Sequence, residues 1–438
     1  MSELEARRLL DDWKGDTYIY GQKVLDRIGE LAKKFGATAL IVGSSSEWAR
    51  EPMHTLEDSL KNADIGYHKE LGARPNCPRE DLYRIASHMA IHRPDSVIAM
   101  GGGSTIDCVK AASVLATYEP SEVEQVFGLD WDVSCTIDPY FGTGMVSRMK
   151  EATGRSPLPV IAVQTASSSA AHLTKYSNIT DPLTGQKKLI VDDAIVPDYA
   201  VFDYEITLKE PEELIVDGGL DGIAHLWEVF MGATGKDYYG KAKKIVSTGI
   251  DLIVKNLKIA MEERENMDAK IALGLGTDLG GYAIMVGGTN GPHLGSFSLV
   301  DILTHGRACA ILNPYYTAFF SEAIEDQLYT IGPIFKEAGY IETDVEGLRG
   351  KKLGETVANG MIEFNKDLGF PTTLKEAGAT EEHLTRMLNA AKNPQLKMKL
   401  LNMPTPLDPD KGDVDRYMKG VLEAAFTGDF GTIKTINN

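Results

Sequence analysis

The sequence has few cysteines and no long apolar segment, and both shortages narrow the class of protein. Four cysteines occur in 438 residues, far apart and with no C-x-x-C pair: Cys77, Cys108, Cys135 and Cys309. No stretch of about 18 apolar residues offers a membrane span, and the charged N-terminal run MSELEARRLLDDWKGD lacks the apolar core of a signal peptide. Reduced thiols in a cytosol are the simplest interpretation, so we expect a cytoplasmic protein.

Positive charge is also in short supply. The chain has 45 basic and 63 acidic residues, a formal net charge of −18, and the acidic residues are spread through both halves. Nucleic acids and anionic membranes call for a basic binding face, so the charge balance argues against both as partners. Hydrophobic residues at 43% and charged residues at 25% are typical of a globular chain, and the length predicts two or three domains.

The N-terminal half has the pattern of an α/β domain. Short, largely continuous apolar runs predict strands that are buried on both faces, as in a parallel sheet covered by helices. These runs are TALIVG (38–43), DSVIAM (95–100), PLPVIAV (157–163) and AVFDYEI (200–206). Helical patterns at 24–35 and 104–117 lie between them. The stretch 118–156 shows little regular pattern, and we expect a long irregular excursion over the sheet.

The pattern changes after about residue 207. Apolar residues then recur every three or four positions, which is the stripe of an amphipathic helix. The clearest stripe is formed by Val246, Ile250, Ile253, Leu257 and Met261. Similar stretches continue to residue 425, with breaks at glycine and proline clusters. We therefore predict an α/β domain at 1–207 and an all-helical domain at 208–438.

A glycine-rich junction joins one predicted strand to the following helix. The run DSVIAM leads into Gly101-Gly102-Gly103-Ser104 and then into the helical pattern TIDCVKAASVLA. Glycines let the backbone approach a phosphate closely, and the N–H groups at a helix start favour negative charge. The junction predicts a pyrophosphate cradle, with a turn that merely needs glycine as the alternative. It is not the G-x-G-x-x-G fingerprint, so the standard dinucleotide fold does not follow from it.

The helical half contains a set of side chains that suits a divalent metal ion. Asp221 and His225 are four residues apart, so a helix places both on one face. His293 follows the run GGTNGP, and His305 begins HGRACAILNPYY. Three imidazoles and one carboxylate suit Fe²⁺ or Zn²⁺ and leave a position open for a substrate oxygen. A single histidine in such a domain is more often a packing or surface residue, so only the set carries the hypothesis.

These features occur together in a chain whose other segments resemble the iron-containing (group III) alcohol dehydrogenase family. The resemblance rests on GGGS followed three residues later by Asp107, on the D-x-x-x-H pair, and on two late histidines. The segments TKYSNITDPLTGQKK (174–188) and HGRACAILNPYY (305–316) are similar to family blocks. The resemblance covers nearly the whole chain. It implies an N-terminal dinucleotide-binding α/β domain with a parallel sheet and a C-terminal all-α metal-binding and substrate domain, the dehydroquinate synthase-like fold.

The resemblance also implies roles for individual residues. Its implied metal ligands are Asp221, His225, His293 and His305. Its implied cofactor-binding residues are Gly101, Gly102, Gly103, Ser104, Asp107, Thr165, Ser168 and Lys188. Asp107 would support the glycine loop, while Thr165 and the serines after it would touch the cofactor.

Four departures set this chain apart from the family pattern. Where the family usually has G-T-G-S-E, residues 168–172 read SSAAH, so His172 replaces an acidic residue. The histidine that normally follows the third ligand by four residues is Phe297. The spacing from His293 to His305 is about two residues shorter than expected, and the excursion at 118–156 is longer. Together the departures indicate a distinct subfamily.

The end of the first predicted strand bears on the choice between NADP and NAD. A carboxylate at this place accepts hydrogen bonds from the ribose of NAD and repels the extra phosphate of NADP. The chain instead has Gly43-Ser44-Ser45-Ser46, with Arg50 a helical turn further on. Small hydroxyl residues and a nearby cation favour NADP over NAD. The alternative is that the serines only cap the next helix.

The expected reaction is reversible hydride transfer between a small alcohol or aldehyde and NAD(P). Fe²⁺ is the expected metal, with Zn²⁺ possible, and His172 is a candidate proton relay because histidine titrates near neutral pH. One alternative is a non-redox, metal- and NAD-dependent lyase of the dehydroquinate synthase type. The other is a non-catalytic, nucleotide-binding assembly subunit. We expect a homodimer or higher homo-oligomer that binds neither nucleic acid nor membrane.

Overall fold

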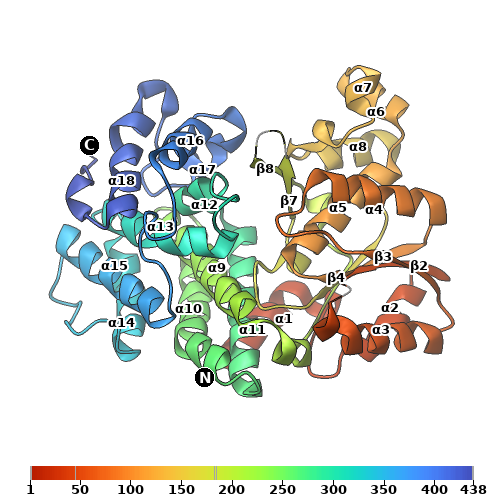
Figure 1. Ribbon diagram of the computed structural model, residues 1–438, viewed down its shortest axis with the longest axis horizontal. Coiled ribbons are helices and arrows are strands. Elements are labelled where there is room, and N and C mark those ends of the chain that lie inside the picture. The colour runs from red at the N-terminus through yellow and green to blue at the C-terminus, as the bar shows by residue number, and fades with distance from the viewer. Residues whose placement is uncertain (1, 45, 182, 184, 437–438) are drawn as a thin grey trace. The chain divides into compact units, whose positions relative to one another are not determined.

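The computed structural model divides the chain into two compact units, and it describes residues 2–44, 46–181, 183 and 185–436 (Figure 1). The α/β unit runs from Asp11 to Pro211. The helical unit runs from Glu212 to the C-terminus and also includes the residues up to Leu10. Each unit is described by itself.

A six-stranded parallel sheet forms the centre of the α/β unit. Its strands follow the order β1-β9-β6-β4-β2-β3, and every neighbouring pair is parallel. The strands are β1 (Tyr18–Gly21), β2 (Thr38–Gly43), β3 (Gly66–Leu71), β4 (Ser96–Gly101), β6 (Val160–Gln164) and β9 (Tyr199–Asp203). The four predicted strands are β2, β4, β6 and β9, and the continuous apolar runs are buried as expected. The predicted fold class, a parallel α/β domain followed by a helical domain, is confirmed.

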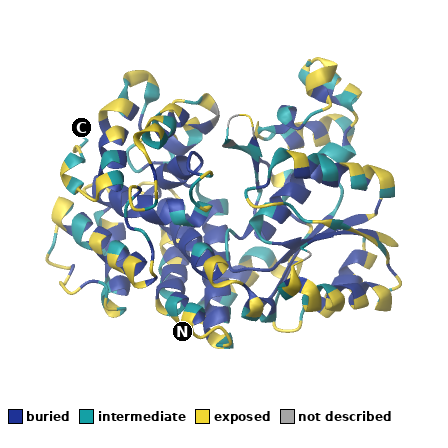
Figure 2. Ribbon diagram, viewed as in Figure 1, coloured by how far each residue is buried: buried dark blue, intermediate teal, exposed yellow. Residues whose placement is uncertain are grey.

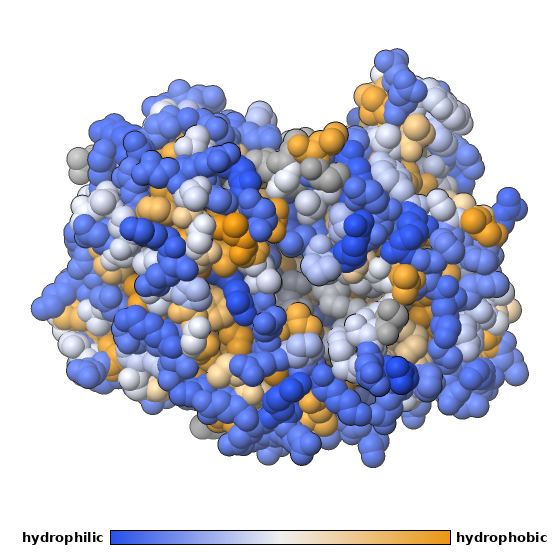
Figure 3. Space-filling view, viewed as in Figure 1, coloured by the Kyte–Doolittle hydropathy of each residue, from blue (hydrophilic) through white to orange (hydrophobic). Residues whose placement is uncertain are grey.

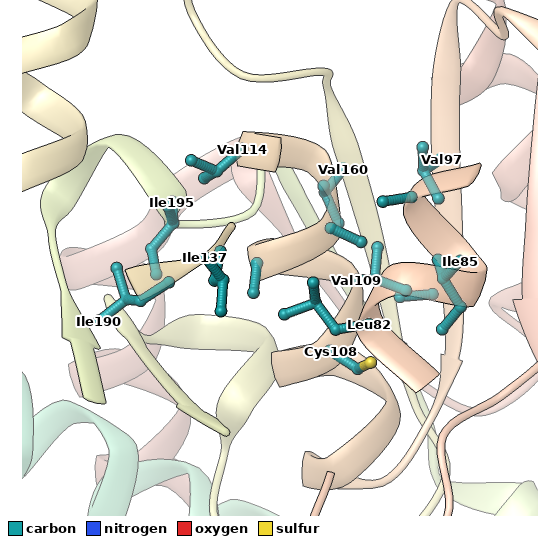
Figure 4. Packing of buried hydrophobic residues seen from close by; sticks show 14 of the residues in the cluster. Leu82, Ile85, Val97, Cys108, Val109, Val114, Ile137, Val160, Ile190 and Ile195 are labelled. Carbon is teal, nitrogen blue, oxygen red and sulfur yellow. The ribbon is translucent and has the colours of Figure 1, made fainter. Parts of the chain in front are cut away.

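Helices pack on this sheet and enclose one of its hydrophobic cores. Figure 4 shows side chains of α4, α5 and the strands pointing toward one another, among them Leu82, Val109 and Val160. Lys110 of α5 is also fully buried and donates hydrogen bonds to the carbonyl oxygens of Ala171, Thr174 and Tyr176. The helices of this unit are α2 (Ile28–Lys33), α3 (Arg50–Asn62), α4 (Arg79–His92), α5 (Gly103–Thr117), α6 (Pro120–Phe127), α7 (Trp131–Ser134) and α8 (Met145–Thr153).

The stretch 118–156 is not the irregular excursion that the sequence pattern predicted. It carries α6, α7, α8 and the short strand β5 (Gly142–Thr143). The helices are short and two of them end at glycine, α6 at Gly128 and α8 at Gly154, so no long periodic pattern develops. β5 pairs with β8 (Gln186–Val191), which forms an antiparallel pair with β7 (Tyr176–Asp181).

The helical unit is an assembly of long and short helices. Figure 2 shows α9 and α11 buried over most of their length, as expected for central helices. The stripe predicted at 246–261 lies on α10, where Val246, Ile250, Ile253 and Leu257 are buried. The helices are α9 (Glu212–Met231), α10 (Tyr239–Glu262), α11 (Met267–Val286), α12 (Gly291–Ser296), α13 (His305–Phe319), α14 (Glu325–Glu337), α15 (Gly350–Asp367), α16 (Glu381–Ala391), α17 (Lys397–Leu401) and α18 (Lys419–Thr427).

The two units differ from the predicted domains 1–207 and 208–438 in two places, at the junction between the units and near the N-terminus. The junction lies after Pro211, at the start of α9. The first part of α1 (Ser2–Lys14) packs within the helical unit, because the Ser2 hydroxyl donates to Asp251 at 2.7 Å and Glu5 pairs with Lys244 at 2.7 Å.

Polar residues cover most of the face seen in Figure 3. Among the described residues, no helix is both long and apolar enough to cross a membrane.

The backbone amides at the start of a buried strand need hydrogen-bond acceptors, and Asp95 is the acceptor at the start of β2. Its Oδ2 accepts hydrogen bonds from the amides of Ala37 and Thr38 and from the Thr38 hydroxyl, at 2.8 to 2.9 Å. The bonds from Thr38 hold the pKa of Asp95 below its ordinary value. A depressed carboxyl pKa stabilises the fold above the unfolded-state pKa, and the stabilisation disappears as pH falls through the folded-state pKa.

We predict that Asp95→Asn lowers the free energy of unfolding at pH 7. The loss is on the order of 1 kcal/mol and no larger, because the site is exposed and solvent screens the charge. The difference from the unsubstituted protein shrinks as pH falls below about 4. Urea unfolding between pH 7 and pH 3 measures it, with Asp12→Asn on the exposed face of α1 as the control. A difference that stays constant over this range contradicts the assignment.

Candidate metal centre and nucleotide loop

Four side chains predicted as metal ligands converge in the helical unit. Asp221 and His225 lie one turn apart on α9, His293 lies on α12 and His305 begins α13. The Nε2 atoms of the histidines lie 3.9, 3.7 and 3.8 Å from Oδ1 of Asp221, in the order His225, His293, His305. Asp221, His225 and His293 are at most 5% exposed, while the His305 side chain is 22% exposed. One open side is what a substrate oxygen requires.

Gly306 explains why α13 lies so close to α9. A Cβ at this position would lie 2.1 Å from the carbonyl oxygen of Asp217 and 3.3 Å from Cβ of Asp221. Any larger residue would push the start of α13 away from α9. The H-G pair in the sequence is therefore one steric unit, in which the glycine brings His305 to Asp221.

Neighbouring side chains orient two of the imidazole rings. Nδ1 of His293 lies 2.6 Å from Oε1 of Glu228, and Oε2 of Glu228 accepts from the Asn290 amide at 2.8 Å. Nδ1 of His305 lies 3.0 Å from the Ser296 hydroxyl, which itself donates to the carbonyl of His293 at 2.8 Å. Because that hydroxyl proton is used, Nδ1 of His305 is assigned as the donor. Both rings thus keep an Nε2 lone pair on the side of Asp221, which is the tautomer that a metal needs.

Burial sets the electrostatics around this cluster. Burial raises the pKa of Glu228 to about 7, although the hydrogen bond from the Asn290 amide favours the carboxylate and lowers the pKa. It lowers the pKa of Lys399 on α17 to about 8, while Glu228, Cys309 and Asp221 act in the opposite direction. The Lys399 ammonium donates to the Thr289 hydroxyl and lies 5.6 Å from the ring centroid of Phe297. A buried cation therefore stands beside a group of buried acids.

The donor set fits a divalent first-row metal ion. Asp221, His293, His305 and Cys309 each have a ligand atom within 4.8 Å of the other three, and His225 approaches the same Asp221 oxygen. Nitrogen, carboxylate and sulfur donors of this kind suit Fe²⁺ or Zn²⁺.

The sequence interpretation did not include Glu228, Ser296, Lys399 or Cys309. Glu228 lies seven residues after Asp221 on the same helix face, and that spacing was a usable signal.

The glycine junction in the α/β unit has the shape of a phosphate cradle. β4 ends at Gly101, Gly102 is the N-cap and α5 begins at Gly103. A Cβ at Gly101 would lie 2.7 Å from Cβ of Thr105, and one at Gly103 would lie 2.6 Å from the Ser169 hydroxyl. A Cβ at Gly102 would meet no atom within 4 Å. The outer glycines therefore serve packing, and the middle one leaves space at a helix start, where an anion is favoured.

Other residues implied for the cofactor site have structural partners nearby. The Ser104 hydroxyl accepts from the Asn76 amide at 3.1 Å. Oδ2 of Asp107, which is buried, accepts from the amide and side chain of Asn178 at 3.0 Å, so it ties β7 to α5. The Thr165 amide donates to Gly101 at 3.2 Å, and the Ser168 hydroxyl accepts from Gln164 at 2.8 Å. Thr165 thus lies directly beside the glycine loop.

The contacts of Lys188 and of the residues after β2 show whether these side chains are available to bind a ligand. Nζ of Lys188 lies 3.0 Å from Asp181 and 3.5 Å from Asp138, so two carboxylates already hold it. The Ser44 hydroxyl accepts from the Ser46 amide at 3.1 Å, and Ser45 lies outside the described residues. Arg50 begins α3, is 64% exposed and pairs with Glu47 at 3.4 Å.

His172 lies inside the core of the α/β unit. It is 1% exposed, its Nε2 is 3.4 Å from the Tyr18 hydroxyl, and its ring packs edge-on against Phe202 at 5.7 Å. Burial lowers the pKa of His172 well below its ordinary value. A relay has to accept a proton, and this environment opposes that, so packing is the role its surroundings favour.

Comparison with known proteins places the chain in a family. The profile of the iron-containing alcohol dehydrogenases matches residues 16–204, and the C-terminal profile of the Fe-containing alcohol dehydrogenase family matches residues 215–415. An NADPH-dependent butanol dehydrogenase of Clostridium saccharobutylicum is 26% identical over 370 residues, 83% of this chain and 85% of that protein. NADH-dependent butanol dehydrogenase A of Clostridium acetobutylicum is 26% identical over 387 residues, 85% and 90% of the two chains.

A solved structure agrees with the fold. The alcohol dehydrogenase from Oenococcus oeni superposes with a TM-score of 0.77 at 22% identity, over 94% of this chain and 98% of that one. At this identity the likeness shows the fold alone. The chain belongs to the iron-containing alcohol dehydrogenase family. It is an NAD(P)-linked alcohol dehydrogenase by class.

The contact between Glu228 and His293 yields a prediction about metal affinity. We expect Glu228→Gln to weaken Zn²⁺ binding by about 10- to 100-fold, because a neutral amide orients the imidazole less firmly than a carboxylate. Competition with a chromophoric chelator measures the affinity. Glu213→Gln, on the exposed first turn of the same helix, is the matched control. Equal affinities for the two variants would remove Glu228 from the site.

The glycine loop gives a second prediction. Gly102→Ala should fold normally, because its Cβ meets open space, yet bind NADPH and NADH at least about tenfold more weakly. Gly103→Ala is the contrast, since its Cβ collides with Ser169 and the loss should appear in thermal stability. Nucleotide fluorescence titration and thermal unfolding separate the two effects. Undiminished nucleotide binding by Gly102→Ala speaks against a cradle here.

Proposed function

We propose that the protein is a metal-dependent alcohol dehydrogenase and aldehyde reductase for small primary alcohols, with Asp221, His225, His293 and His305 holding the metal. The observation that carries the proposal is the approach of three imidazole nitrogens to one buried carboxylate oxygen. The substrate class follows the two butanol dehydrogenases, each aligned over more than four-fifths of its length. Both alternatives, the lyase and the non-catalytic subunit, find no support among these relatives.

The cofactor assignment rests on the α/β unit. We propose that the loop Gly101–Ser104 binds the pyrophosphate, with Thr165 and Ser168 beside it and Asp107 bracing α5 from behind. Lys188 would reach the cofactor only by leaving its carboxylate partners. The two butanol dehydrogenases differ in their cofactor, so the choice between NADP and NAD rests on the residues that follow β2. NADP is favoured because Ser44, rather than a carboxylate that would repel the phosphate, follows β2. The exposed Arg50 offers a cation once it leaves Glu47.

The chemistry divides between the bound groups and the chain. A bound divalent ion supplies Lewis-acid polarisation of the substrate oxygen, and the nicotinamide gives or takes the hydride. Asp221, His225, His293 and His305 position the ion, and Glu228 and Ser296 hold two of the rings in the required tautomer. The burial of Asp221 and His293 excludes water from one side, which strengthens every electrostatic interaction there. His172 enters as a packing residue.

Location and assembly complete the proposal. A cytoplasmic protein agrees with Cys77, Cys108 and Cys135, none of which is in a disulfide. Fe²⁺ is the metal we propose, with Zn²⁺ as the substitute that the same donors accept. The homo-oligomeric state expected from the sequence stays a prediction.

The test is turnover with defined metals. Chelator-treated protein is loaded anaerobically with Fe²⁺ or Zn²⁺, and NADPH and NADH oxidation by butanal is followed by absorbance. We expect metal-dependent turnover, a lower KM for NADPH than for NADH, and a loss of at least about a hundredfold in kcat/KM for His225→Ala. His54→Ala, an exposed histidine on α3, is the control. Metal-independent turnover overturns the proposed centre, and equal KM values overturn the NADP preference.

A further inference from the structure

Cys309 lies among the proposed metal ligands. It follows His305 by one turn on α13 and is fully buried. Its Sγ belongs to the group of four ligand atoms, with those of Asp221, His293 and His305, that all lie within 4.8 Å of one another. The neighbours of this thiol are therefore the very side chains that would hold the ion.

The helices present donors in a matching way. α9 offers Asp221 and His225 at a spacing of four residues, and α13 offers His305 and Cys309 at the same spacing. That spacing places each pair on one helix face. Because Gly306 lets α13 lie against α9, the two faces meet at one volume, and His293 of α12 adds a fifth donor.

The distances are compatible with a bound ion. Metal–nitrogen bonds of about 2.0 to 2.1 Å and metal–sulfur bonds of about 2.3 Å place neighbouring ligand atoms roughly 2.9 to 3.8 Å apart around a five-coordinate ion. The imidazoles of His225, His293 and His305 already lie 3.7 to 3.9 Å from Asp221. Sγ of Cys309 lies within 4.8 Å of the ligand atoms of Asp221, His293 and His305, so a small rotation of its side chain brings it within bonding range of the same ion.

We propose that Cys309 is a metal ligand and that its sulfur shifts the preference of the centre toward Zn²⁺ over Mn²⁺. On binding, the S–H bond breaks, its electron pair forms the bond to the ion, and the proton leaves to solvent. Soft thiolate donors favour Zn²⁺, whereas Mn²⁺ prefers oxygen. The inference rests on the proposed metal centre, and it adds a donor to it.

Cobalt spectroscopy tests the bond directly. Metal-free protein is titrated with Co²⁺, whose visible d–d bands report binding and whose near-ultraviolet band reports a thiolate ligand. We expect both signals in the unsubstituted protein and loss of the near-ultraviolet band alone in Cys309→Ser. Cys108→Ser, at a buried thiol of the α/β unit, is the control and keeps both.

A second chain variant covers the case in which Cys309→Ser does not fold. The triple variant Cys77→Ser, Cys108→Ser, Cys135→Ser leaves Cys309 as the one cysteine of the sequence, so it must retain the thiolate band. Chelator competition adds a second readout: the ratio of Zn²⁺ to Mn²⁺ affinity should fall at least about tenfold in Cys309→Ser.

The outcomes separate this inference from the proposed function. Visible Co²⁺ bands without a thiolate band in the unsubstituted protein overturn Cys309 as a ligand and leave the centre standing. A thiolate band that survives Cys309→Ser, or is missing from the triple variant, also overturns it. Failure to bind Co²⁺ or Zn²⁺ at all overturns the metal centre itself.

Discussion

The approach of three imidazole nitrogens to Oδ1 of Asp221 is the constraint around which the helical unit is arranged. Polar groups buried this deeply cost free energy unless hydrogen bonds or a cation compensate them. Glu228 and Ser296 occupy Nδ1 of two rings, so the hydrogen bonds lie on the outer side of the cluster. The inner side, toward Asp221, presents lone pairs of one kind, which is the arrangement that the proposed divalent cation would require.

Helix packing gives that constraint its precision. Gly306 brings the backbone of α13 within a few ångströms of α9, and the same closeness carries Cys309 into the donor group. Sites built on packed helices hold geometry better than sites on loops. The nucleotide loop of the α/β unit follows the same logic, since Gly101 and Gly103 are occupied by packing and only Gly102 faces open space. In both units, glycines next to a proposed ligand site allow a close approach of the backbone.

Sequence patterns predicted the parts of this protein that depend on local periodicity. Strand β2 and helix α5 match the apolar runs almost to the residue, because both are buried on most of their surface. Strand β3 escaped notice because its residues are largely exposed or half-buried, and α6 to α8 are too short for a stripe to develop. The ligand spacing on α9 was readable, but the partners of His293 and His305 are set by tertiary packing, which no spacing encodes. Whether the individual ligands and cofactor contacts are right stays a prediction.

Phe297 shows how this chain differs from the family pattern at its centre. It stands where a second histidine is usual, its ring stacks on His305 at 5.7 Å between centroids, and Lys399 lies over it. A phenyl ring fixes the orientation of His305 but cannot carry a proton. The usual histidine is thus replaced by an aromatic spacer between a proposed ligand and a buried ammonium group. Any proton that leaves the substrate must follow a route that avoids this position.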